Sequence, residues 1–368
     1  MHTILITVMQ KLIIIFTLVF AGFCNLSAYA SAGHAQDTSK TEQSEGIDIT
    51  EVIFDHILDA HEWHIMTLNE GEANEKHVVV PLPVILWDEG RLVVFMSSRF
   101  HHAEHSDYQL GTKENFNGEY QGKVVHVDET GQVVSVPLDF SITKNVAALM
   151  FSAALLLLIF IPVARSYKKR GIAAPKGLQG FMEPLILFVV DDIVRPNIGE
   201  KRYARYAPYL LTLFFFILIN NLMGLIPFFP FGANLTGNIA VTMTLAVLTL
   251  IIVNFSGNKG YWKHIFAAPG VPVWLLPIMI PVELIGVISK PFALMVRLFA
   301  NITAGHIIVM SLISLIFIFQ SLGIAPVSVF FVLFMDLLEL LVAALQAYIF
   351  TLLTSLFIGL AVQEAEHH

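Results

Sequence analysis

Ionisable and amide side chains recur at regular intervals inside the two longest apolar runs of the sequence. In the first run, Glu283, Lys290 and Arg297 are spaced by seven residues, and Asn301 follows four residues later. At about 100° per residue, a helix carries all four on one face. His306 lies nine residues after Arg297, on the opposite side of such a helix. The run therefore predicts a helix with a polar stripe on one side and a lone histidine on the other.

A second polar stripe follows in the next apolar run. Asp336, Glu339, Ala343 and Gln346 are spaced by three, four and three residues, so a helix carries them on one side. Ionisable groups at membrane depth are costly unless they are paired or hydrated, and they usually mark ion or proton paths. A structural role, as a charge paired within the helices or near the membrane surface, would explain one such residue but not two stripes.

The residue types indicate proton transfer. Carboxylates and histidine gain and lose protons at accessible pH, whereas the arginine guanidinium stays charged. A row of proton-exchanging groups that contains one permanent cation, Arg297, therefore predicts a proton path that is interrupted at the arginine.

The composition indicates that most of the chain lies in a membrane. Of the 368 residues 56% are hydrophobic and only 14% are charged, against about 25% in soluble domains. The charges are concentrated outside the apolar runs: residues 31–145 carry 7 Lys and Arg and 20 Asp and Glu, a net charge of −13. This acidic balance, and the net charge of −8 for the whole chain, argue against a nucleic acid as partner.

Residues 1–30 have the pattern of a secretory signal peptide. An apolar core precedes Ala28-Tyr29-Ala30, which is a small-residue cleavage pattern. The alternatives are a lipoprotein signal at Cys24, which the bulky Phe23 disfavours, and an uncleaved first helix. Because Cys24 is the single cysteine, the chain forms no internal disulfide.

Residues 31–142 predict a small acidic region outside the membrane, of α+β or β-rich type. Segments rich in Val, Ile and aromatic residues alternate with turns at Asp88-Glu89-Gly90 and Glu129-Thr130-Gly131. We expect one short helix within residues 48–65, and strands within residues 77–87, 91–98, 122–131 and 132–140.

The next segments predict the membrane topology. Residues 143–164 are long enough for a first membrane helix, and residues 165–206 hold nine Lys and Arg against four Asp and Glu. By the positive-inside rule this second segment is cytoplasmic, which places residues 31–142 in the periplasm. Its apolar part is interrupted by charges such as Glu183 and Asp191, so we expect an amphipathic helix on the inner membrane surface rather than a span. Thereafter residues 207–256 predict a membrane helix pair.

The last third predicts a long tilted helical hairpin, residues 271–363, after a cytoplasmic loop at residues 257–270. A straight helix of the 49 residues from Val271 to Phe319 would be about 70 Å long, against about 30 Å for the membrane core. Such a helix must be strongly tilted, and prolines such as Pro281 and Pro291 are expected to break its first half. The predicted fold class is an all-α polytopic membrane protein of about five to six membrane helices, with a small external N-terminal region.

Several motifs resemble a known family. The chain from about Asn145 to its end resembles subunit a of F-type ATP synthases, in the motifs PVELIGVISKPFALMVRLFANITAGH, LLELLVAALQAYIFTLL and NNLMGLIPF. The N-terminal part resembles the extended form of this subunit in Bacteroidetes-like bacteria. The resemblance implies a non-catalytic stator in the bacterial inner membrane, beside a ring of c subunits and b-type peripheral stalk subunits. It implies no cofactor, because ATP chemistry belongs to partner subunits.

The resemblance also implies roles for the stripe residues. Arg297 matches the arginine that faces a carboxylate on the c-ring, and Asn301 and Gln346 match amides beside it. His306 and Glu339 match a polar pair in the half-channel that is open to the outside. In some members of the family the two residue types are exchanged between these positions.

Further residues are assigned to the two half-channels. Glu283 matches an acidic residue of the inner half-channel, with Ser289 and Lys290 nearby. Asn221 matches an amide at the outer opening, and we expect incoming protons to pass Asn221 and Asp336.

The alternative function is a secondary proton- or sodium-coupled transporter, which would also place charges near the membrane midplane. It predicts an inverted repeat and a substrate cavity, and the sequence shows neither.

Overall fold

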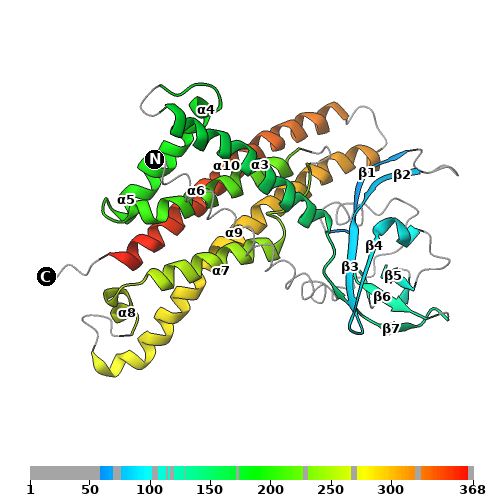
Figure 1. Cartoon of the computed structure of the whole chain (residues 1–368), viewed down its shortest axis with the longest axis horizontal. Helices are drawn as coiled ribbons and strands as arrows, with labels where there is room; N and C mark the ends of the chain where they lie inside the picture. The colour runs from blue at the N-terminus through cyan, green and yellow to red at the C-terminus, as the bar shows by residue number, and fades with distance from the viewer. Residues whose placement is uncertain are drawn as a thin grey trace.

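The structure is a computed structural model of the chain, and it describes residues 59–68, 76–101, 107–112, 115–116, 120–128, 130–170, 174–226, 231–266, 272–319 and 325–363. The signal peptide predicted at residues 1–30 lies outside the described residues. A β-rich N-terminal part lies at one end of a larger helical part, and the two are joined at the start of helix α3 (Figure 1).

The N-terminal part consists of short antiparallel strands. Three sheets have the strand orders β1-β2, β4-β3-β8 and β5-β6-β7. The strands are β1 (Glu62–Leu68), β2 (Lys76–Pro81), β3 (Pro83–Asp88), β4 (Arg91–Met96), β5 (Tyr108–Leu110), β6 (Val124–Val127), β7 (Val133–Ser135) and β8 (Leu138–Asp139), with a 3-10 turn η1 (Ser97–His101) after β4. The predicted β-rich region and its four strand segments are therefore confirmed.

One prediction in this part is wrong where it can be checked. The helix expected within residues 48–65 cannot extend over its last four residues, because Glu62–Leu68 is strand β1. Trp63 of β1 is paired with Val80 of β2 and is buried. Pairing with a partner strand and burial of one face outweigh local helix preference. Residues 48–58 lie outside the described residues.

A polar network closes the hairpin between β3 and β4. Glu89 and Gly90 both have positive φ, which is the geometry of a tight hairpin turn, as predicted at this position. The buried Asp88 carboxylate accepts hydrogen bonds from the hydroxyls of Tyr108 (3.0 Å) and Ser135 (2.7 Å), and its Oδ2 lies 2.8 Å from Nδ1 of His126. These contacts join the sheet of β3 to the sheet of β5, β6 and β7.

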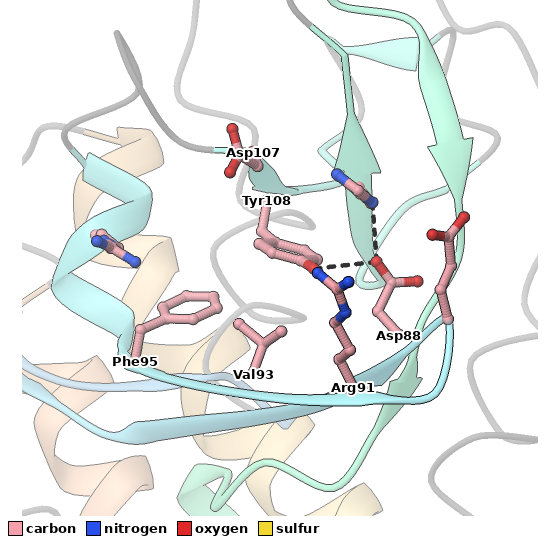
Figure 2. Close-up of a pocket in the computed structure, with 9 residues that line it drawn as sticks. Asp88, Arg91, Val93, Phe95, Asp107 and Tyr108 are labelled. Atoms are coloured by element: carbon pink, nitrogen blue, oxygen red, sulfur yellow. Dashed lines mark hydrogen bonds and ion pairs between the residues drawn. The ribbon is translucent and has the colours of Figure 1, made fainter.

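The same residues line an open pocket of about 460 Å³ (Figure 2). Tyr108 stacks between Phe95 and His126, with ring centroids 5.9 and 4.8 Å apart. Arg91 and Asp88 extend into the pocket from the hairpin end, as Figure 2 shows. The carboxylate of Asp88 thus anchors an aromatic wall.

We expect Asp88→Asn to lower the stability of the N-terminal part at neutral pH. Burial opposes ionisation of Asp88, but hydrogen bonds from Ser135 and Tyr108 and the charge of His126 outweigh it and hold its pKa below the usual 3.8. The stabilisation is therefore present above that pH and is lost as pH falls through the lowered pKa. The expected loss at pH 7 is about 1–3 kcal/mol, measured by hydrogen exchange of the β3 and β4 amides.

The difference between Asp88→Asn and the wild type should begin to shrink as pH falls below about 4, where the unfolded chain takes up the proton. It should vanish below the lowered pKa, where the native carboxyl is protonated too. Glu89→Gln, in the same turn, is the matched control and should leave exchange nearly unchanged. A difference that persists unchanged at low pH would contradict the role of the ionised carboxylate.

Within the described residues, five helices are long and apolar enough to cross a membrane, which confirms the predicted fold class. These are α3 (Lys144–Arg170), α6 (Tyr203–Gly224), α7 (Ile239–Ser256), α9 (Leu276–Phe319) and α10 (Ala325–Val362). Shorter elements connect them: α4 (Leu178–Leu187), the π-helix η4 (Phe188–Val194), α5 (Arg195–Ile198), α8 (Lys259–Phe266) and the 3-10 turn η5 (Val273–Leu275).

Helix α6 forms the centre of the helical core. Most of its side chains are buried, and it packs on α3, α10 and η4. The long helices α9 and α10 pack on each other as the predicted hairpin, and α9 also packs on α7 (Figure 1). Their tilt in a membrane stays a prediction.

The helix boundaries differ from those expected in three places. Helix α3 continues six residues beyond residue 164, because the basic residues that follow are good helix formers. Helix α6 begins at Tyr203, four residues before the expected start of the helix pair at residue 207, and holds Pro208 inside it. Residues 259–266, expected as a loop, form helix α8, whose start is capped by Asn258 Oδ1 accepting from the backbone N–H of Tyr261 at 2.9 Å.

The prolines do not break helix α9. Pro277 lies in the first turn, where a backbone N–H has no helical partner to lose. Pro281 and Pro291 lie inside the helix, and each removes one helical hydrogen bond. The helix nevertheless runs for 44 residues. Packing along α7, α8 and α10 outweighs these local costs.

Hydrogen bonds tie together the end of the helical part that is far from the strands. The backbone N–H of Asn258, before α8, donates to the carbonyl of Ala361 near the end of α10 at 3.0 Å. Arg202, before α6, donates to the carbonyl of Val362. The starts of α6 and α8 and the end of α10 therefore meet at this end.

Candidate functional site

A histidine and a glutamate meet inside the α9–α10 hairpin. Nδ1 of His306 lies 2.8 Å from Oε1 of Glu339, and the two side chains are only 11% and 6% exposed. We call these two side chains the buried pair. Gly305 leaves room for it, because a Cβ added there would lie 2.7 Å from Oε1 of Glu339. The spacing predicted that His306 lies away from the polar stripe, and the resemblance implied its pairing with Glu339, which this contact shows.

Arg297 lies on a different face of α9. Both Arg297 and Asn301 are exposed, and no hydrogen bond or ion pair joins either of them to another described residue. Its nearest neighbours on this face include the exposed Ala293 and Ala300, whose side chains are small. The permanent cation thus stands uncovered on the polar stripe of α9.

The second stripe is divided between the inside and the outside of the hairpin. Glu339, Ala343 and Gln346 are buried, whereas Asp336 is exposed one turn before Glu339. Asn221 of α6 reaches the same strip of α10, since its Nδ2 donates to the carbonyl of Ala343 at 3.0 Å. No described hydrogen bond joins Gln346 to the arginine of α9.

The three remaining candidates lie near the other end of α9. Glu283 is half-buried, Ser289 is exposed and donates to the carbonyl of Gly286 at 3.1 Å, and Nζ of Lys290 lies 5.6 Å from the ring centre of Phe357 on α10. Glu283 is 23 residues from His306, or about 35 Å along the helix. The structure thus separates two polar regions along α9 with Arg297 between them.

Sequence reasoning missed two residues that shape this site. Gly305 gives the Glu339 carboxylate its space, and Thr303 Oγ1 donates at 3.4 Å to the carbonyl of Gly237, in the loop before α7. The only sequence signal for Gly305 was that a small residue directly precedes the lone histidine. No local pattern indicated the contact of Thr303. Among the described residues, no cluster of three or more His, Cys, Asp or Glu side chains could hold a metal.

Comparison with known proteins identifies the helical part. The sequence profile of the ATP synthase A chain matches residues 147–359, which is more than half of the chain. The chain belongs to the ATP synthase A chain family. As a subunit a it is a multi-pass, non-catalytic component of the proton-translocating Fo part of the ATP synthase complex. This family membership excludes the alternative function, a secondary transporter.

Named relatives support the same family. An ATP synthase subunit a of Chloroherpeton thalassium is 50% identical over 235 residues, which cover 62% of this chain and 69% of the relative. An ATP synthase subunit a 2 of Chlorobium luteolum is 42% identical over 321 residues, covering 81% of this chain and 91% of the relative. An ATP synthase subunit a of Myxococcus xanthus is 43% identical over 248 residues, covering 66% and 80%.

The N-terminal part matches a separate profile. A domain of unknown function, DUF8433, matches residues 52–141. The Chlorobium alignment covers more of the chain than its helical part, so that relative shares residues of the N-terminal part. The expectation that this extended form is typical of Bacteroidetes-like bacteria is therefore corrected, because the relatives are mostly Chlorobi.

Proposed function

We propose that this chain provides two proton half-channels and the arginine between them, and so couples proton flow to rotation of a c-ring. The observation that carries the proposal is that two polar groups lie on different faces of α9. His306 is buried and paired with Glu339, while Arg297 is exposed on another face of the helix.

The exposed arginine needs a partner from another subunit. A guanidinium at the membrane centre costs several kcal/mol in contact with lipid, and it cannot escape by losing its proton. A carboxylate on a neighbouring c subunit would offset this cost. The pairing must be loose, because a dry ion pair would hold the rotor in place, and Asn301 and Gln346 can share hydrogen bonds or water with the charge.

Protons would enter through the outer half-channel. They would pass Asn221 and Asp336 to the buried pair, which transfers a proton to the carboxylate of the ring. The neutral carboxyl can then turn into lipid, whereas an ionised one would be strongly disfavoured there. Each proton that crosses a potential of 100 mV supplies about 2.3 kcal/mol.

Protons would leave through the inner half-channel. After nearly a full rotation the carboxyl reaches the region of Glu283, Ser289 and Lys290 and releases its proton to the cytoplasm. The basic segment at residues 165–205 supports a cytoplasmic location for this end, with the N-terminal part in the periplasm. The positive charge of Arg297 repels a proton that would cross directly between the half-channels.

Cysteine cross-linking tests which face of α9 meets the ring. In a chain carrying Cys24→Ser, we expect Asn301→Cys to form a disulfide with a cysteine placed next to the ring carboxylate. Ile302→Cys is the matched control, since this neighbouring side chain is only 2% exposed and points into the helical core. The yield is measured by gel mobility under oxidising conditions. Equal yields, or cross-linking of position 302 alone, would contradict the proposed orientation.

A further inference from the structure

Three buried amide side chains each leave one polar atom without a hydrogen-bond partner among the residues that the structure describes. Asn145 at the start of α3, Asn221 in α6 and Asn234 in the loop before α7 are 2%, 1% and 2% exposed. The unpartnered atoms are Oδ1 of Asn145, Oδ1 of Asn221 and Nδ2 of Asn234. An unmet buried polar group costs about 1–3 kcal/mol, so native proteins usually satisfy it with ordered water.

Packing brings these amides to one junction between the two parts of the chain. Ala233 packs with Trp63 of β1 and with Ala148 of α3. A Cβ on Gly224, at the end of α6, would lie 3.6 Å from the carbonyl oxygen of Ala233. Ala148, Gly224 and Ala233 lie only three, three and one residues from the three amides. The loop before α7 therefore lies where the three segments that carry these amides meet, and we call this place the junction.

The junction is linked to the buried pair by two hydrogen bonds. Asn221 donates to the carbonyl of Ala343, one turn after the glutamate of the pair. Thr303 donates to the carbonyl of Gly237 and lies three residues before the histidine of the pair. Polar groups thus continue from the loop to both helices that carry the pair.

On its other side the junction meets a carboxylate of the N-terminal part. Oδ1 of Asp59 accepts from the backbone N–H of Asn145 at 3.0 Å, and Oδ2 accepts from the hydroxyl of Thr143 at 2.8 Å. Asp59 therefore caps α3 from a position 86 residues away in the sequence. A proton-exchanging group lies directly beside the first of the three amides.

Other charged groups surround Asp59. Lys144 follows Thr143 at the start of α3, and Nε2 of His61 lies 2.6 Å from Oδ2 of Asp139 in β8. Burial raises the pKa of Asp59, against the lowering effect of its hydrogen bonds from Asn145 and Thr143 and of the charges of Lys144 and His61. The carboxyl thus exchanges protons closer to neutral pH than an exposed aspartate does.

We propose that the N-terminal part forms the outer mouth of the proton path, in which Asp59 collects protons and water held by Asn145, Asn234 and Asn221 carries them to the buried pair. This inference rests on the proposed function, which makes the buried pair the proton acceptor of the outer half-channel. It assigns a role to a region matched only by a domain of unknown function.

The chemistry is a relay of one proton. The Asp59 carboxylate takes a proton from external water, and then passes it to a hydrogen-bonded water of the junction and regains its charge. Amide side chains suit such a path because they orient water through both a donor and an acceptor without binding the proton themselves. A purely structural cap of α3 would need the oxygen atoms of Asp59 but not its exchangeable proton.

Asp59→Asn separates these two roles, because asparagine keeps an acceptor oxygen for the cap but cannot relay protons. The test uses the whole ATP synthase in vesicles, with ATP synthesis driven by an imposed proton gradient and potential. We expect a loss of at least about tenfold at external pH 8, where protons are scarce, and less than about twofold at pH 6. Asp128→Asn is the matched control, since Asp128 caps an exposed turn of the same region and is far from the junction.

A second pair of variants tests the water path. Asn234→Leu removes the orphaned donor and fills its space, and should lower synthesis at both pH values. Asn234→Asp keeps the acceptor for the backbone N–H of Gly237 and replaces the lost donor by an oxygen that can still hold the junction water, so it should retain most of the rate.

The outcomes distinguish this inference from the proposed function. A pH-independent loss in Asp59→Asn would reduce Asp59 to a structural cap and overturn its assignment as collector. If Asp59→Asn and Asp128→Asn gave equal rates while Glu339→Gln lost synthesis, the outer mouth of the proton path would lie elsewhere. The proposed function would then still stand. An unchanged rate in Glu339→Gln would remove the proposed function itself.

Discussion

Arg297→Ala is expected to abolish ATP synthesis driven by a proton gradient in the reconstituted complex. Removing one member of a charge pair that is shielded from water costs about 3–5 kcal/mol, because the other charge is left without compensation. If that cost falls on the passage of each ring carboxylate, it slows rotation by about 100- to 5,000-fold. The same change removes the positive barrier between the half-channels. Passive proton flux should therefore rise, or persist, while coupled synthesis is lost.

Two further variants make this prediction specific to the position. Arg297→Lys keeps the charge but loses the planar fork that can move between carboxylates, so we expect it to be strongly impaired as well. Arg205→Ala removes an exposed arginine at the start of α6 that contacts the ring of Tyr206, and should retain synthesis. ATP synthesis and dye-detected proton flux are measured on the same vesicles. Retention of coupled synthesis by Arg297→Ala would contradict the arginine's role.

The central geometry of the site could be predicted from helical spacing alone. The offset of nine residues from Arg297 to His306 places them on different faces of any straight helix, and α9 remains helical over this interval. The pairing of His306 with Glu339 needed more than spacing, because it depends on how far α10 is shifted along α9. The family resemblance supplied that register, and the distance of 2.8 Å confirms it.

Other features follow from contacts that no local pattern reveals. Lys290 shares the spacing of Arg297 but lies over the ring of Phe357, because α10 runs alongside that part of α9. The capping of α3 by Asp59 joins residues that are 86 positions apart, and no sequence pattern in either segment predicts the contact. The low helix preference of proline predicted breaks at Pro281 and Pro291. Helix α9 is nevertheless continuous there, because tertiary packing stabilises it.

Glu339→Gln is the second change for which we expect a large effect, and it tests the buried pair directly. Glutamine has nearly the same shape and can keep a hydrogen bond to Nδ1 of His306, but it cannot pass on a proton. A positioned proton-transfer group typically contributes about 10²–10⁴ in rate, so proton-driven synthesis and ATP-driven proton pumping should fall by at least about 100-fold. Glu183→Gln, the same substitution in α4 outside this site, should leave both activities nearly unchanged.

The exchange variant His306→Glu with Glu339→His distinguishes chemistry from packing. It keeps one acid and one imidazole in contact, so it should restore much of the activity that Glu339→Gln loses, and more than either single exchange does. The single exchange Glu339→His leaves two imidazoles together, and His306→Glu leaves two carboxylates that repel each other. Recovery in the double variant, measured as the coupling between the two changes, would show that the pair acts as a proton-exchanging unit. If Glu339→Gln were fully active, the buried pair would be a packing feature of the hairpin and the outer half-channel would have to reach the ring by another route.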